Sequence, residues 1–138
     1  MRATLQSEGV DTISVVNVLV TNDLGIRKYN RIYRQKDKST DVLSFPMQVF
    51  KHPGWENIKK AEYDETTGEL PLGDIIISLE AVKKQAAEYG NTVDYETAYL
   101  IIHSTLHLLG YDHTDKKSEK TMHAKAKQIL YEMKLLLN

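Results

Sequence analysis

The segment 93–110, VDYETAYLIIHSTLHLLG, constrains the fold of this chain more than any other feature. It follows Thr92, a residue suited to cap a helix, and it is apolar nearly all round between Ala98 and Leu109. A helix without a polar face lies inside a core, so the rest of the chain has to cover it. The same segment carries His103 and His107.

The elements that cover this helix are predicted from hydrophobic periodicity and capping residues. The pattern predicts strands at 14–20, 40–46 and 72–78, helices at 23–34, from 79 to about 89 and at 115–137, and a long loop or hairpin at 47–70. This order predicts an α+β fold: a single small mixed sheet, helices packed mainly on one side, and the histidine-bearing helix in the core. At 138 residues, the chain 1–138 is expected to form one domain.

Composition excludes several classes of protein. No cysteine is present, so a disulfide framework and a thiolate metal site are both excluded. The formal net charge of −1 gives no overall attraction to nucleic acid or to membranes. The longest apolar runs fall far below the roughly 20 residues of a membrane span, and the first residues lack an apolar targeting segment. A cytoplasmic location is therefore the expectation.

Histidine spacing indicates a metal site. Residues four apart lie on one face of a helix, so His103 and His107 can bind the same ion. Gly110 can end the helix in a left-handed turn and return a third ligand, His113. The resulting pattern, H-x-x-x-H-x-x-G-x-x-H, has the ligand spacing of the metzincin zinc proteases, so the core helix is expected to be zincin-like. Neutral imidazoles also suit copper, iron and nickel, so Zn2+ rests on geometry and abundance.

Three local ligands favour an open, catalytic site over a closed structural one. His52 and His123 are the alternative fourth ligands, but both are expected on the surface. In H-E-x-x-H peptidases a glutamate follows the first histidine, whereas this chain has Ser104. Asp112 is the nearest carboxylate, and it can act as the catalytic base or orient a histidine; the sequence leaves both roles open.

A basic run lies before the second predicted strand. Six basic residues in the window 27–38 meet a single acid, Asp37, and they are Arg27, Lys28, Arg31, Arg34, Lys36 and Lys38. Such a run is either a solvated helix face or a surface for an RNA backbone.

Three blocks of sequence together resemble a known family. HSTLHLLGYDH at 103–113 resembles the H-G-x-L-H-L-x-G-Y-D-H signature of the YbeY family of bacterial endoribonucleases. YRQKDKSTDVLSFP at 33–46 and LGDIIIS at 72–78 resemble that family's other two blocks, in the same order. The resemblance extends from about Ser14 to the end of the chain.

The resemblance implies a cytoplasmic zinc hydrolase that acts in 16S ribosomal RNA 3′-end maturation and ribosome quality control. The implied partners are ribosomal RNA, the small ribosomal subunit and ribosome-assembly proteins. The ligands fall on His103, His107 and His113, and the family's functional arginine falls on Arg34. With Asp112, Arg34 forms the predicted catalytic pair. There are two competing interpretations. One is a zinc peptidase, and the other is a non-catalytic assembly factor whose metal only holds the last helices together.

Two departures from the family pattern affect these expectations. Ser104 stands where the signature has glycine, and it could alter the hydrogen bonds of the site. Family members usually carry another strand and helix before the part that matches Ser14, so the first strand is expected to be absent or to lie partly outside the sequence. The sequence blocks that resemble the family also contain three polar residues that either line the active-site cleft or hydrogen-bond the local backbone: Asp41, Ser44 and Asp74.

Overall fold

A computed structural model describes residues 1–8, 14–48, 67–111 and 115–137. Its elements are α1 (Arg2–Ser7), β1 (Ser14–Thr21), α2 (Asp23–Arg34), β2 (Val42–Pro46), β3 (Leu70–Ser78), α4 (Leu79–Tyr89), α5 (Val93–Leu108) and α6 (Lys116–Leu137). All predicted strands and helices are confirmed, with some ends shifted by one or two residues. Helix α1 was not predicted, and most of the expected 47–70 loop lies outside the described residues.

The sheet is mixed, as predicted, with strand order β1-β3-β2. Strand β1 runs parallel to the central strand β3, and β2 runs antiparallel to it. Asp74 of β3 pairs with Asn17 on one side and with Phe45 on the other. Residues 1–8 contain helix α1 and no strand, and β1 forms an edge of the described sheet.

A bulge in β3 allows one face of this strand to stay apolar along its length. The register with β1 shifts between Val15 and Val16, whose partners are Pro71 and Gly73. Because an extra residue reverses the side-chain alternation, Leu72 and Ile75 both pack in the cluster that contains Leu108 of α5.

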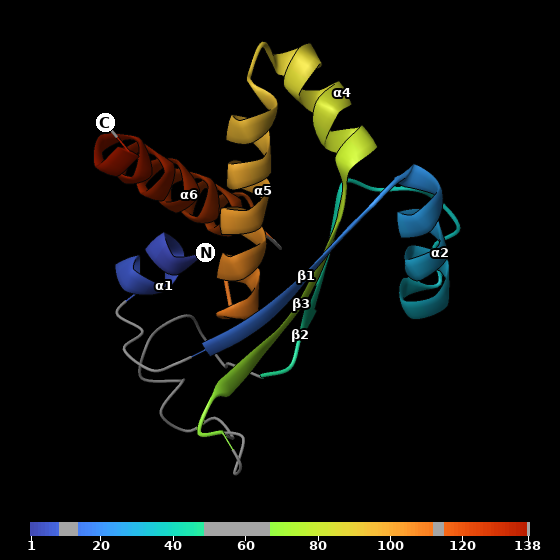
Figure 1. The fold of residues 1–138 in the computed structure, drawn as a ribbon, viewed down its shortest axis with the longest axis horizontal. Coiled ribbons are helices and arrows are strands. Elements are labelled where there is room, and N and C mark those ends of the chain that lie inside the picture. Colours follow the sequence, from blue (N-terminus) through green and yellow to red (C-terminus); the bar gives the residue numbers. More distant parts are fainter. Residues whose placement is uncertain (9–13, 49–66, 112–114, 138) are drawn as a thin grey trace.

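Helices cover both faces of the sheet, with most of them on one side (Figure 1). Helix α5 packs on one face, and α6 lies beyond it, where Ile102 and Leu106 of α5 contact Met122. Helix α2 packs on the opposite face, where Ile26 meets Leu43 and Ile76. The histidine-bearing helix therefore lies in the core, as predicted. Among the described residues, no helix has the length and apolar character needed to cross a membrane.

Polar side chains cap the starts of three helices, and one of them is Thr92, the cap expected from the sequence. Asn22, Ser78 and Thr92 accept hydrogen bonds from backbone N–H groups in the first turns of α2, α4 and α5. The Ser78 hydroxyl also donates to Asp23 at 2.6 Å, which joins the starts of α2 and α4. These caps set where α2 and α5 begin on opposite faces of the sheet.

Candidate functional site

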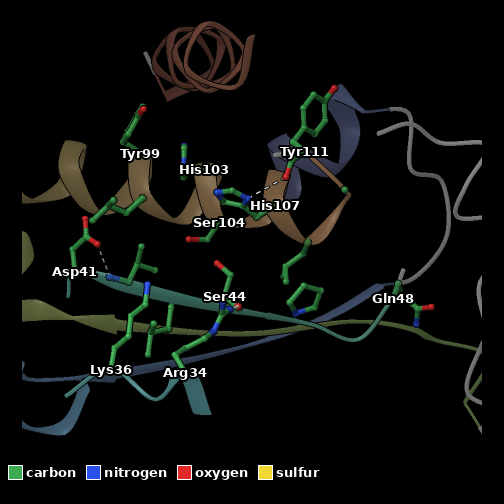
Figure 2. Close-up of a pocket in the computed structure, with 16 residues that line it drawn as sticks. Arg34, Lys36, Asp41, Ser44, Gln48, Tyr99, His103, Ser104, His107 and Tyr111 are labelled. Atoms are coloured by element: carbon green, nitrogen blue, oxygen red, sulfur yellow. Dashed lines mark hydrogen bonds between the residues drawn. The ribbon is translucent and has the colours of Figure 1, made fainter. Parts of the chain in front are cut away.

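A cavity of about 1000 Å³ lies between α5 and β2. Figure 2 shows His103, Ser104 and His107 coming from α5 on one side, and Arg34, Lys36 and Ser44 from the α2–β2 region on the other. The histidines of α5 and two residues of the basic run, Arg34 and Lys36, therefore line the same cavity.

His103 and His107 lie one turn apart on α5 and both line the cavity. Their ring centroids are 4.9 Å apart, with planes inclined at 77°. Two imidazoles that share one tetrahedral ion, at metal–nitrogen distances of about 2.0–2.1 Å, have ring centres roughly 5 Å apart. The observed spacing fits a shared metal ion.

The hydrogen bond of His107 fixes which ring nitrogen can bind a metal. Nδ1 lies 3.1 Å from the backbone oxygen of Tyr111. A carbonyl oxygen only accepts, so Nδ1 carries the proton, and in the neutral ring Nε2 is then the nitrogen that can bind a metal. Metal-binding histidines typically donate their other ring N–H in this way. The bond to Tyr111 thus favours, in the neutral ring, the tautomer that a ligand requires.

The predicted glycine turn follows directly after α5. Gly110 has φ +100°, a left-handed conformation that favours glycine. The Tyr111 backbone N–H donates back to Leu106 at 3.1 Å. Asp112 and His113 come next and lie outside the described residues, so their roles stay predictions. Within the described part of the chain, no three His, Cys, Asp or Glu side chains are grouped to hold a metal.

Tyr111 is anchored from the other end of the chain. Its hydroxyl donates to Glu8 at 2.8 Å, and Glu8 forms an ion pair with Lys125 at 3.0 Å. The Lys125 ammonium also lies 5.6 Å from the centre of the Tyr111 ring. Burial raises the pKa of the Tyr111 phenol. Helix α1 is thereby tied to the residue that orients His107, a link that sequence analysis missed.

Arg34, the last residue of α2, reaches into the cavity. Its Nη2 donates to the backbone oxygen of Ser44, and its guanidinium lies 5.2 Å from the centre of the Phe45 ring. Among the described residues Arg34 forms no ion pair, whereas Arg27 pairs with Asp37 at 2.9 Å. Arg34 is therefore a cation of the basic run whose charge no described carboxylate neutralises.

The three polar residues singled out in the sequence, Asp41, Ser44 and Asp74, line two different cavities. Asp41 and Ser44 line the cavity. Asp41 accepts from the Val42 backbone N–H at 2.8 Å and from Gln85 at 3.2 Å, which indicates a structural role. Asp74 lies in a different cavity, where it accepts from Asn17 at 3.0 Å.

Ser104 is fully buried and lines the cavity beside the histidines. Its hydroxyl makes no hydrogen bond within the described residues. No carboxylate occupies this position, where an H-E-x-x-H peptidase has its base. The hydroxyl is a buried polar group without a described hydrogen-bond partner beside the two histidines.

Tyr99 also lines the cavity, and sequence analysis missed it as well. Its ring stacks 5.9 Å from that of His103, and its hydroxyl lies 2.7 Å from Nδ1 of His123. Burial raises the pKa of the Tyr99 phenol. His123, an alternative fourth ligand, is thus engaged with Tyr99. His52, the other alternative, lies outside the described residues.

Fold and site together define an α+β protein in which a buried helix presents two histidines to a cleft with a basic opposite wall. Comparison with known sequences gives the family. A family model described as Endoribonuclease YbeY matches residues 1–134. The chain belongs to the YbeY endoribonuclease family, which confirms the resemblance seen in its three sequence blocks.

Curated relatives support this membership. An Endoribonuclease YbeY from Agathobacter rectalis is 42% identical over 132 residues, which cover 93% of this chain and 80% of the relative. One from Clostridium kluyveri is 43% identical over 137 residues, covering 95% of this chain and 83% of the relative. The solution structure of TM1509 from Thermotoga maritima matches with a TM-score of 0.60 and 30% identity, covering 94% of this chain and 73% of that one.

Proposed function

We propose that this protein is a metal-dependent endoribonuclease that cleaves single-stranded or flexible RNA, with 1–138 acting as one hydrolase domain. Membership of the YbeY family supports the ribonuclease activity. The observation that carries the chemistry is that Arg34 lines the same cavity as His103 and His107. A cation opposite a metal site suits a phosphodiester, which carries negative charge, better than it suits a neutral peptide bond.

In this proposal His103, His107 and His113 hold one Zn2+. When bound, the ion supplies a Lewis acid that can polarise the scissile phosphate and lower the pKa of a water molecule. His107 is kept in the binding tautomer by Tyr111. Arg34 presents a planar fork to the phosphate oxygens, and Lys36 adds charge on the same wall.

Asp112 has two roles in the proposal, and one variant separates them. As a proton acceptor it would be disabled in Asp112→Asn while the metal stayed bound. As a partner that orients a ligand histidine, it would lose metal affinity in the same variant. Metal content and RNA cleavage measured together distinguish the two.

The proposed substrate is the 3′ end of 16S ribosomal RNA, with a further role in ribosome quality control. This assignment follows from the family. The small ribosomal subunit and ribosome-assembly proteins are then the proposed partners, and the cytoplasm, where ribosomes are assembled, is the proposed location.

The competing functions are a zinc peptidase and a non-catalytic assembly factor. The experiment incubates the metal-loaded protein with a structured RNA that contains single-stranded segments and with an unfolded protein, each with and without a chelator. We expect chelator-sensitive cleavage of RNA alone. Cleavage of the protein substrate would support the peptidase, and no chelator-sensitive cleavage of either would support the assembly factor.

A further inference from the structure

A second cavity, of about 550 Å³, lies on the face of the sheet that carries α2. This volume falls within the range of about 300–1,000 Å³ typical of ligand pockets. Helix α2 packs on Ile76 and Leu43, and the next positions along that face of the sheet are Asp74 and Phe45. The cavity thus lies beside α2, over Asp74 and Phe45, whose side chains are on the sheet face that α2 covers.

Aromatic rings form one wall of this cavity. Tyr29 and Tyr33 stack at 6.3 Å with planes 9° apart, and the Tyr33 ring meets Phe45 edge-on at 5.6 Å. Tyr33 is nevertheless 63% exposed. Exposed aromatic rings are the surfaces on which proteins stack unpaired nucleobases.

The polar floor of the cavity offers acceptors. Asn17 donates from Nδ2 to Oδ1 of Asp74 at 3.0 Å. The remaining oxygens, Oδ2 of Asp74 and Oδ1 of Asn17, make no hydrogen bond to described residues. A carboxylate repels phosphate but accepts strongly from N–H groups. Guanine presents two neighbouring donors, N1–H and the 2-amino group, which match such a floor.

The second cavity and the proposed active site lie on opposite faces of the edge strand β2. Ser44 lines the first cavity and Phe45 the second. The Arg34 guanidinium lies 5.2 Å from the centre of the Phe45 ring, and Tyr33 is its neighbour in the chain. A phosphate held by Arg34 would therefore bring an adjacent base toward Tyr33.

We propose that this second cavity, the base pocket formed by Asn17, Tyr29, Tyr33, Phe45 and Asp74, binds one base of the RNA strand and prefers guanine. The base stacks on Tyr33 and donates from its Watson–Crick edge to Asp74. The inference rests on the proposed function, because the RNA strand that supplies the base is the one held at Arg34.

Nucleotide binding tests the base pocket without any cleavage. Guanosine, inosine and adenosine 5′-monophosphates are titrated into the intact protein while the tyrosine ring resonances are followed by NMR. Guanosine monophosphate should shift Tyr33 at the lowest concentration. Inosine monophosphate, which lacks the 2-amino group, should bind more weakly, and adenosine monophosphate should bind weakest.

Asp74→Asn tests the hydrogen-bonding part. An asparagine can still accept from Asn17, but its amide N–H2 replaces the acceptor Oδ2. The preference for guanosine over adenosine monophosphate should fall roughly tenfold, since a hydrogen bond to a charged group is lost. An unchanged preference would overturn the assignment of Asp74.

Tyr33→Leu tests the stacking part, with a matched control elsewhere. Tyr131 on α6 is 64% exposed, close to the 63% of Tyr33, and it does not line the base pocket. Tyr33→Leu should weaken nucleotide binding roughly fivefold or more, because one aromatic face is lost, and Tyr33→Phe should retain it. Tyr131→Leu should have no effect, so equal losses in the two leucine variants would overturn the pocket.

These outcomes are separable from those of the proposed function. Chelator-sensitive RNA cleavage without nucleotide shifts at Tyr33 would reject the base pocket and leave the ribonuclease standing. Nucleotide binding at Tyr33 in a protein that cleaves no RNA would reject the ribonuclease and retain a guanine-binding site. Shifts at Tyr33 that follow protein concentration and ignore nucleotide would assign this surface to a second copy of the chain and overturn the proposal.

Discussion

Nδ1 of His107 donates to the backbone carbonyl of Tyr111 at 3.1 Å. The turn at Gly110 brings this carbonyl into place, and His113 follows three residues later in the sequence. The glycine turn therefore orients one proposed ligand and precedes the next one in the sequence. This relationship explains why a glycine, which tolerates φ +100°, stands between the second and third histidines.

Replacing any one proposed ligand should remove the metal. His103→Ala, His107→Ala and His113→Ala each leave two imidazoles, which cannot match a three-nitrogen site. Metal content after dialysis is the measurement. His123→Ala is the control, since His123 is bonded to Tyr99, and it should retain a full equivalent. A full equivalent in every single ligand variant would show that the coordination is wrong.

Glu8 should affect metal affinity although it does not line the cavity. Glu8→Ala frees the Tyr111 hydroxyl, loosening the residue whose carbonyl orients His107. Loss of a group that hydrogen-bonds a ligand directly typically weakens metal binding 10–100-fold; Glu8 acts one residue further out, so we expect roughly tenfold, the lower end of this range. The measurement is competition for zinc against a chelator of known affinity.

Two variants control this prediction. Glu8→Gln keeps an oxygen that accepts from Tyr111, so its zinc affinity should stay near that of the unmodified protein. Glu88→Ala, an exposed substitution on α4, should leave zinc affinity unchanged. If Glu8→Ala lowered the free energy of unfolding but not zinc affinity, Glu8 would serve the fold alone.

How much the sequence predicts depends on how local each signal is. Caps such as Thr92 and the turn at Gly110 act within a few residues, so they were predictable. The bond between Glu8 and Tyr111 joins residues 103 apart in sequence, and neither residue signals it. Tertiary contacts of this kind arise only from packing α1 against α5 and α6.

Asp74 shows how a single inserted residue changes a site prediction. Strict alternation would put Asp74 on the same face of β3 as Leu72, toward α5. The bulge at Gly73 reverses the alternation, so Asp74 lines the base pocket on the opposite face. A glycine beside an aspartate is compatible with either arrangement, and only the strand register distinguishes them.

Gly73→Ala should destabilise the protein strongly. At φ +147°, a Cβ would lie 2.3 Å from the backbone oxygen of Phe45 and 2.9 Å from the Leu108 side chain. We expect a loss of about 2–3 kcal/mol in the free energy of unfolding, measured with urea. Gly90→Ala is the matched control, because Gly90 also has positive φ but nothing within 4 Å; it should lose about 1 kcal/mol. Equal losses would mean that β2 moves to admit the new methyl group.

Arg34 separates phosphate chemistry from peptide chemistry. Arg34→Ala should keep the fold and the metal, because the side chain is exposed and lies on the wall opposite the histidines, but it should lose RNA cleavage. Arg34→Lys should restore little, since an ammonium keeps the charge without the two-pronged fork. Circular dichroism, metal content and cleavage rate are measured on each variant.

Arg27, Lys28 and Arg31 provide the comparison within the same helix. Arg27 is already paired with Asp37, so Arg27→Ala should change cleavage least. Lys28→Ala and Arg31→Ala should weaken RNA binding gradually and flatten its dependence on salt, as the loss of backbone contacts does. Arg34→Ala should instead lower the cleavage rate at saturating RNA, because the phosphate is no longer held beside the histidines. If cleavage rate and salt dependence changed equally in Arg34→Ala and Arg27→Ala, Arg34 would be ordinary surface charge and the catalytic role would pass to other residues.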